Sequence, residues 1–125
     1  MTKAKQTPDP EREHRIDMEI VVDAYDEQER AMGWYYYLQD RLQFPFKATC
    51  IEKRPISPLR INGKVEVIDM AGEEECEHEV FVTICWKGED LAVPLSQLEP
   101  AGTTDEQTKQ AVEDWHYWVG MGYTY

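Results

Sequence analysis

The first third of the chain has the apolar spacing that is typical of a helix lying on a core. Apolar side chains recur three, four or seven residues apart over residues 21–42. They are Val21, Tyr25, Ala31, Met32, Tyr35, Leu38 and Leu42. Asp17 or Asp23 is a candidate N-cap, and Pro45 ends the helix because the residue before a proline avoids helical dihedrals. Gly33 costs about 1 kcal/mol relative to alanine inside a helix, so we expect another backbone to approach it closely.

The period changes after residue 45, where short apolar runs alternate with turn residues and predict β-strands. The expected strands are residues 46–51, 64–70, 80–86 and 91–93, followed by a short 3₁₀ turn between Pro94 and Pro100. Both faces of the run 80–86 are largely apolar, which is typical of an interior strand. Strands this short, whose edges must be closed or covered, predict a small, partly open antiparallel sheet or barrel of SH3-like type.

A second helix is predicted near the end of the chain. Thr104 stands three residues before Gln107, which is a capping-box pattern. Helical spacing then continues through Ala111, Trp115 and Trp118. Gly120 or Gly122 ends the helix. The predicted fold class is therefore α+β, with a small SH3-like antiparallel sheet flanked by an N-terminal and a C-terminal helix.

Charge divides the chain into a short tail and one domain. Residues 1–16 contain Pro8, Pro10 and mixed charges with few apolar residues, so we expect a disordered tail, and we expect residues 17–125 to form a single domain. The net charge of the 125 residues is −12. Residues 1–16 carry +1, which leaves −13 on the rest. Such a surface repels nucleic acid and anionic membranes, and it attracts cations and basic protein partners.

The cysteines indicate a reducing compartment. There are three of them, an odd number without the spacing of a disulfide framework. Cys50 and Cys85 lie in apolar runs and are expected to be buried, whereas Cys76 lies in an acidic segment. No signal peptide opens the chain and no apolar run approaches the roughly 18 residues of a membrane span. We expect a soluble cytoplasmic protein.

The connection between the second and third predicted strands carries the candidate chemistry. Its carboxylates are Asp69, Glu73, Glu74, Glu75, Glu77 and Glu79. Hard oxygen ligands this dense favour a hard cation, above all Ca²⁺. Asp26 and Asp40 of the first helix are candidates to complete the shell. The alternative interpretation of the connection alone is a solvated acidic loop that binds nothing in particular.

Other sites fit the sequence less well. An EF-hand loop requires alternating Asp or Asn ligands before a glycine, and residues 69–73 lack them. Cys76 and His78 are a pair of soft-metal ligands, but zinc needs three or four at regular spacing. There is no Gly-rich phosphate loop, nucleophile elbow or His-Glu-x-x-His, so we predict that the protein is not an enzyme.

Three stretches together resemble the cyanobacterial calcium-binding protein (CcbP) family of small acidic proteins. They are residues 29–38 with the trailing Phe-Pro-Phe at 44–46, residues 92–99 and residues 114–120. The resemblance covers roughly residues 17–123. It implies Ca²⁺ binding through a negatively charged surface, with a role in buffering or signalling by cytoplasmic calcium. The ligand set proposed above comes from carboxylate density, not from the resemblance.

A second hypothesis keeps the fold and changes the ligand. An SH3-like interaction module with an acidic face would recruit a basic protein segment, and such binding weakens steeply with salt. A chelating Ca²⁺ site would resist salt far better, so a comparison at low and high salt separates the two.

Overall fold

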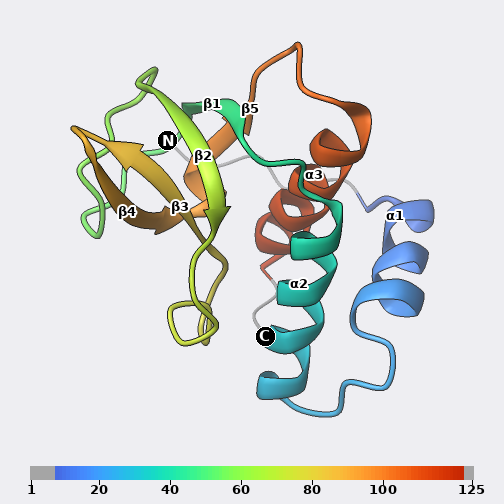
Figure 1. Ribbon diagram of the computed structural model, residues 1–125. Helices are drawn as coiled ribbons and strands as arrows, with labels where there is room; N and C mark the ends of the chain where they lie inside the picture. The colour runs from blue at the N-terminus through green and yellow to red at the C-terminus, as the bar shows by residue number, and fades with distance from the viewer. Residues whose placement is uncertain (1–7, 123–125) are drawn as a thin grey trace.

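The computed structural model describes residues 8–122, which form three α-helices and a five-stranded antiparallel sheet. The elements are α1 (Pro10–Arg15), η1 (Ile16–Ile20), α2 (Glu27–Arg41), β1 (Phe46–Cys50), β2 (Lys64–Met70), β3 (Phe81–Trp86), β4 (Glu89–Pro94), η2 (Leu95–Gln97), β5 (Leu98–Pro100) and α3 (Glu106–Gly120). Helices α2 and α3 lie between the sheet and the N-terminal α1–η1 layer (Figure 1). None of the helices in the described part of the chain has the length and hydropathy needed to cross a bilayer.

The sheet confirms the predicted partly open α+β architecture. Its strand order is β4-β3-β2-β1-β5. Strands β4 and β5 form the two ends and do not pair with each other, so the sheet is not closed. Strand β3 pairs on both sides, as its apolar faces predicted. The side chains of Val82 and Ile84 are fully buried on its inner face.

The first predicted helix is two segments in the structure. Residues 16–20 form a π-helical turn, and Asp23 adopts a left-handed backbone with φ of 60° that separates this turn from α2. The N-cap is Asp26, whose side chain accepts a hydrogen bond of 2.8 Å from the Glu29 amide. Asp17 and Asp23 were the wrong caps. The apolar spacing of the sequence continues across the interruption between η1 and α2, because Ile16 and Ile20 are buried against the same core as α2.

The segment expected to be disordered also contains a helix. Pro10 stands at the first position of α1, and the Asp9 side chain accepts from the Arg12 amide at 3.1 Å. Arg15 donates two hydrogen bonds to the buried carboxylate of Asp114 on α3, at 2.6 and 3.1 Å. This ion pair, rather than apolar burial, fixes α1, so composition did not predict it. The rest of the expected tail, residues 1–7, lies outside the described residues.

Helix α3 begins one residue later than the capping box predicted. Asp105 is the N-cap and accepts from the Thr108 amide at 2.9 Å. The Gln107 side chain donates to the carbonyl of Arg41 at 3.2 Å instead of returning to the helix start. The helix ends at Gly120. Residues 123–125 lie outside the described part of the chain.

The core between α2 and α3 is aromatic. Trp34 is fully buried, and its ring centroid lies 5.0 Å from that of Trp115 and 5.6 Å from that of Trp118. Aromatic pairs at this separation stabilise a core beyond their buried area. Cys50 is buried as expected, but Cys85 is exposed because it lies on the outer side of β3. The prediction for Cys85 was wrong.

His116 gives the fold a testable pH dependence. Burial lowers the pKa of His116 from its ordinary value, although the Leu95 carbonyl 3.3 Å away and the carboxylates of Glu99 and Glu113 oppose this shift. The unfolded imidazole titrates near about 6.5. Below that pH the unfolded state takes up a proton that the folded state resists, so stability should fall as pH decreases. Urea unfolding from about pH 7 to pH 5 should show a shallower decline of stability for H116Q than for the native protein.

Candidate metal centre

The acidic loop, residues 71–80, connects β2 to β3 and runs beside the N-terminal half of α2 (Figure 1). Two successive turns shape it, with the Glu75 amide donating to the Gly72 carbonyl at 3.0 Å and the Cys76 amide to the Glu73 carbonyl at 3.1 Å. These turns point neighbouring glutamates in different directions. The loop is therefore compact in spite of the repulsion between its carboxylates.

Buried anchors hold the start and the middle of the acidic loop. The hydroxyl of Tyr35 on α2 donates to the Ala71 carbonyl at 3.1 Å. The Cys76 thiol is buried and lies 3.4 Å from both the amide and the carbonyl oxygen of Phe81. Burial raises the pKa of the Cys76 thiol, which keeps it protonated. Cys76 is therefore a buried, protonated thiol that anchors the loop through its contacts with Phe81.

Glu79 ends the loop in an ion pair. Its carboxylate accepts a hydrogen bond of 2.6 Å from Arg54, which lies on the β1–β2 connection. This hydrogen bond is the main cause of the raised pKa of Arg54. Glu79 is thus already neutralised by a protein cation, whereas the other glutamates of the loop form no ion pair with a lysine or arginine of residues 8–122.

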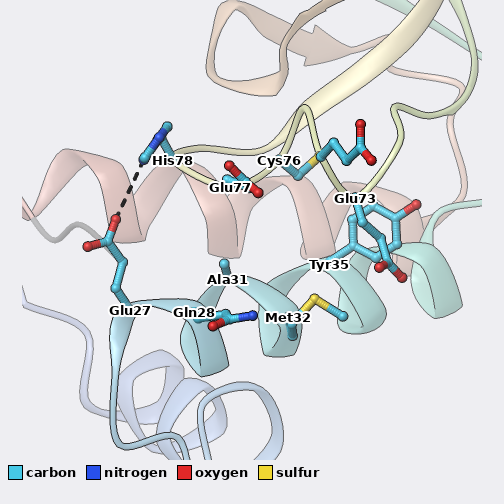
Figure 2. Close-up of a pocket in the computed structure, with 10 residues that line it drawn as sticks. Glu27, Gln28, Ala31, Met32, Tyr35, Glu73, Cys76, Glu77 and His78 are labelled. Carbon is cyan, nitrogen blue, oxygen red and sulfur yellow. Dashed lines mark ion pairs between the residues drawn. The ribbon is translucent and has the colours of Figure 1, made fainter.

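A hollow of about 530 Å³ lies between the acidic loop and the first turns of α2. Its floor is formed by Ala31, Met32, Tyr35 and Cys76, and its acidic rim by Glu27, Glu73, Glu74 and Glu77. Figure 2 shows Glu27 rising from α2 toward His78, with 3.6 Å between the carboxylate and Nδ1. Glu73 is positioned by Tyr36, whose hydroxyl donates to it at 3.1 Å. Among the described residues, no lysine or arginine lines the hollow.

The structure brings together only part of the predicted site. Glu73, Glu74 and Glu77 share the hollow. The Glu75 carboxylate folds back over Gly72 instead of lining it. The side chain of Asp69 accepts a hydrogen bond of 2.8 Å from the next amide in its own strand.

The two carboxylates predicted from the first helix lie elsewhere. Asp26 caps α2, and Asp40 is exposed beside Arg41, in a second hollow that Glu19 and Gly33 also line. The residue of α2 that reaches the acidic loop is Glu27, which sequence reasoning missed. Its signal was present, because residues at i, i+4 and i+8 of a helix share a face and Glu27 precedes Ala31 and Tyr35 at that spacing.

The donor set fits Ca²⁺ in its chemistry. Four carboxylates around one hollow supply the hard oxygen ligands that Ca²⁺ takes in flexible geometry. They do not yet converge, since within residues 8–122 no group of three His, Cys, Asp or Glu side chains is placed to hold a metal ion directly. A bound ion therefore requires the glutamate side chains to turn inward, which exposed side chains can do without moving the backbone.

Comparisons with known proteins agree on one family. A protein-family model described as calcium binding, that of CcbP, matches residues 14–119. The crystal structure of Anabaena CcbP is 40% identical, with a TM-score of 0.85 over 98% of this chain and 100% of that one.

A calcium binding protein in its calcium-binding form is also 40% identical, with a TM-score of 0.82 over 94% of this chain and 95% of that one. The comparison with curated proteins gave no match. Because the family model covers most of the sequence and both structures superpose over nearly the whole fold, the chain belongs to the CcbP family of calcium-binding proteins.

Proposed function

We propose that this protein binds Ca²⁺ in the hollow between the acidic loop and α2, with carboxylates of Glu27, Glu73, Glu74 and Glu77 as ligands. The observation that carries the proposal is the acidic rim itself, where four carboxylates surround one hollow and no lysine or arginine from the described part of the chain lines it. Membership of a calcium-binding family supports the choice of ion. The Arg54 pair makes Glu79 a weaker candidate ligand than the other loop glutamates.

The electrostatics explain why an ion would be taken up here. Carboxylates gathered on one rim repel one another, and the net charge of −12 adds to the unfavourable local potential. A divalent cation relieves this repulsion. Binding only to the folded state stabilises that state by about 2.7 kcal/mol when free Ca²⁺ is a hundredfold above Kd.

The role we propose is sequestration or sensing of Ca²⁺ in the cytoplasm. Three free cysteines support a reducing compartment. Buffering would follow from the affinity alone, whereas sensing would require a rearrangement when the ion binds. The acidic loop, tied to α2 through Tyr35 and Tyr36, is the segment in which such a rearrangement would begin.

Titration calorimetry of Ca²⁺ into protein stripped with a chelator tests the site. The variant E27Q/E73Q/E74Q/E77Q keeps side-chain size and removes the four rim charges. Its Ca²⁺ affinity should fall by about tenfold or more, because affinity depends on the number of charged ligands. The native protein should prefer Ca²⁺ to Mg²⁺, which demands a stricter octahedral shell.

A matched control separates a site from a diffuse field. The variant E11Q/E66Q/E89Q/E99Q removes the same number of charges from exposed positions outside the hollow. Its Ca²⁺ affinity should change by about threefold or less, since exposed charges that do not line the hollow act on the ion only through solvent and are weakened by salt. Equal losses in the two variants would show that the ion is held by the general surface potential and that the hollow is not the site.

A further inference from the structure

Most exposed apolar side chains of this protein are gathered in two charged segments. Eight large apolar residues are exposed within residues 8–122, and six of them fall in these segments. Residues 17–29, which we name the acidic segment, expose Met18, Val22 and Tyr25. Residues 51–61, which we name the basic segment, expose Ile51, Ile56 and Ile61.

The two segments have opposite charges. The acidic segment contains six carboxylates and no lysine or arginine. The basic segment contains Lys53, Arg54 and Arg60 against a single acid, Glu52. It is a local exception in a chain whose net charge is −12. Apolar side chains surrounded by charge are the composition of a polar-rimmed interface.

Several of these charges have no ion-pair partner among residues 8–122. Lys53 and Arg60 form no ion pair within the described residues, although Arg54 is paired with Glu79. Asp17 and Asp23 form none there either, while Glu19 is paired with Arg41 at 3.2 Å. The unpaired charges remain available to a second molecule.

The fold keeps the two segments apart. The basic segment leaves the outer end of β1, and the acidic segment lies beyond α2 on the far side of the molecule (Figure 1). The base of the basic segment is held by hydrogen bonds of the Asn62 amide to the Cys50 carbonyl and of the Ile51 amide to the Gln97 carbonyl, at 2.8 and 2.7 Å. The segments therefore cannot meet within one molecule, but they can meet between two copies.

We propose that this protein associates head to tail, with the basic segment of one copy docked on the acidic segment of the next. Isoleucines of one segment would cover Met18, Val22 and Tyr25 of the other, and Lys53 and Arg60 would face Asp17 and Asp23. Contacts between two different patches are heterologous, so the association closes into a ring where the rotation between copies allows it and otherwise extends into short chains. Charge complementarity favours a second copy as the partner, because each interface pairs the basic segment of one copy with the acidic segment of another.

Net repulsion keeps this association weak. Each copy carries −12, so chains should form at high protein concentration and moderate ionic strength. At a Debye length of about 8 Å the overall repulsion is screened while contacting charges still attract. The proposal does not rest on Ca²⁺ binding, and its test is made with a chelator present.

Sedimentation velocity over a range of protein concentrations tests the proposal. The weight-average sedimentation coefficient of the native protein should rise with concentration at about 0.15 M salt and stay monomeric at about 1 M salt, where the Debye length is about 3 Å. K53E/R60E should remain monomeric, and so should D17K/D23N, in which asparagine tolerates the left-handed backbone of Asp23. Mixed in equal amounts, the two variants should associate again, because each supplies a segment that complements the other.

Two controls change net charge equally elsewhere. K47E/K87E matches K53E/R60E, and E89K/D90N matches D17K/D23N; all four positions are exposed and outside both segments. Both controls should associate like the native protein. A native chain that is monomeric at every concentration and salt, or association that survives K53E/R60E, would overturn the proposal. Failure of the two mixed variants to associate would also overturn the proposal. So would a native protein that binds vesicles or other proteins but does not associate with itself.

Discussion

Replacing Asp114 by alanine is expected to lower the free energy of unfolding by about 3 kcal/mol. The carboxylate is fully buried and accepts hydrogen bonds from Arg15 at 2.6 Å and from the Tyr37 hydroxyl at 2.8 Å. Arg12 lies 3.1 Å from it. Burial raises the pKa of Tyr37 to about 12, and its hydrogen bond to Asp114 acts in the same direction. Alanine leaves two arginines and a buried hydroxyl without this shared acceptor.

In addition to lowering the overall stability, D114A should loosen α1 locally. Because Arg12 and Arg15 tie α1 to α3 through Asp114, trypsin should cleave D114A after these arginines far faster than it cleaves the native protein. E113Q changes the neighbouring, exposed carboxylate and should alter stability by less than about 1 kcal/mol. Chemical denaturation and limited proteolysis measure both effects. If the free energies of unfolding of D114A and the native protein differed by less than about 1 kcal/mol, the buried network would not hold α1 in place.

Replacing Gly33 by alanine is expected to destabilise the protein by about 2 kcal/mol or more. A methyl group there would overlap the backbone carbonyl oxygen of Ile20, which belongs to η1. Alanine is the better helix former by about 1 kcal/mol, so the observed loss is what remains after that gain. The backbone cannot yield as a flexible side chain would, and η1 must move away from α2.

Gly102→Ala is the matched control for this substitution. A Cβ at Gly102 meets no atom within 4 Å, so alanine there should be neutral or stabilise slightly by restricting the unfolded chain. Urea unfolding of the two variants gives opposite signs if close approach at Gly33 is the cause. A stable G33A would mean that η1 is free to shift at no cost.

Gly33 also illustrates which parts of the fold were predictable. Its placement against another backbone was expected from the cost of glycine in a helix, and the Ile20 carbonyl confirms it. Strand Lys64–Met70 was predicted to the residue, because turn residues flank an alternating apolar run. Helix α1 was not predictable in this way. It is held by Arg15 and Asp114, which are 99 positions apart, and no local pattern records such a pair.

The acidic character of the hollow was predictable from the sequence, and its lining residues were predictable only in part. Carboxylate density identified Glu73, Glu74 and Glu77, which do share one hollow. Carboxylate density does not tell where each side chain points. It therefore could not distinguish the lining residues from Glu75, which turns back over Gly72, and from Glu79, which pairs with Arg54. Glu27 was missed because density was counted along the chain, whereas the helix face through Ala31 and Tyr35 carries it to the loop.

The anchors of the acidic loop also bear on its conformational entropy. Fixing the backbone of one residue costs about 1–2 kcal/mol at room temperature. If the loop had to be ordered from a random coil, this cost would offset much of the free energy of ion binding. Tyr35 at Ala71, Cys76 at Phe81 and Arg54 at Glu79 restrain it before any ion arrives. Only the short stretches of chain between these anchored residues remain to be ordered when an ion binds. Ion affinity is then governed by dehydration of the ion and by repulsion among glutamates, both of which can be tuned by side-chain substitution while the scaffold stays the same.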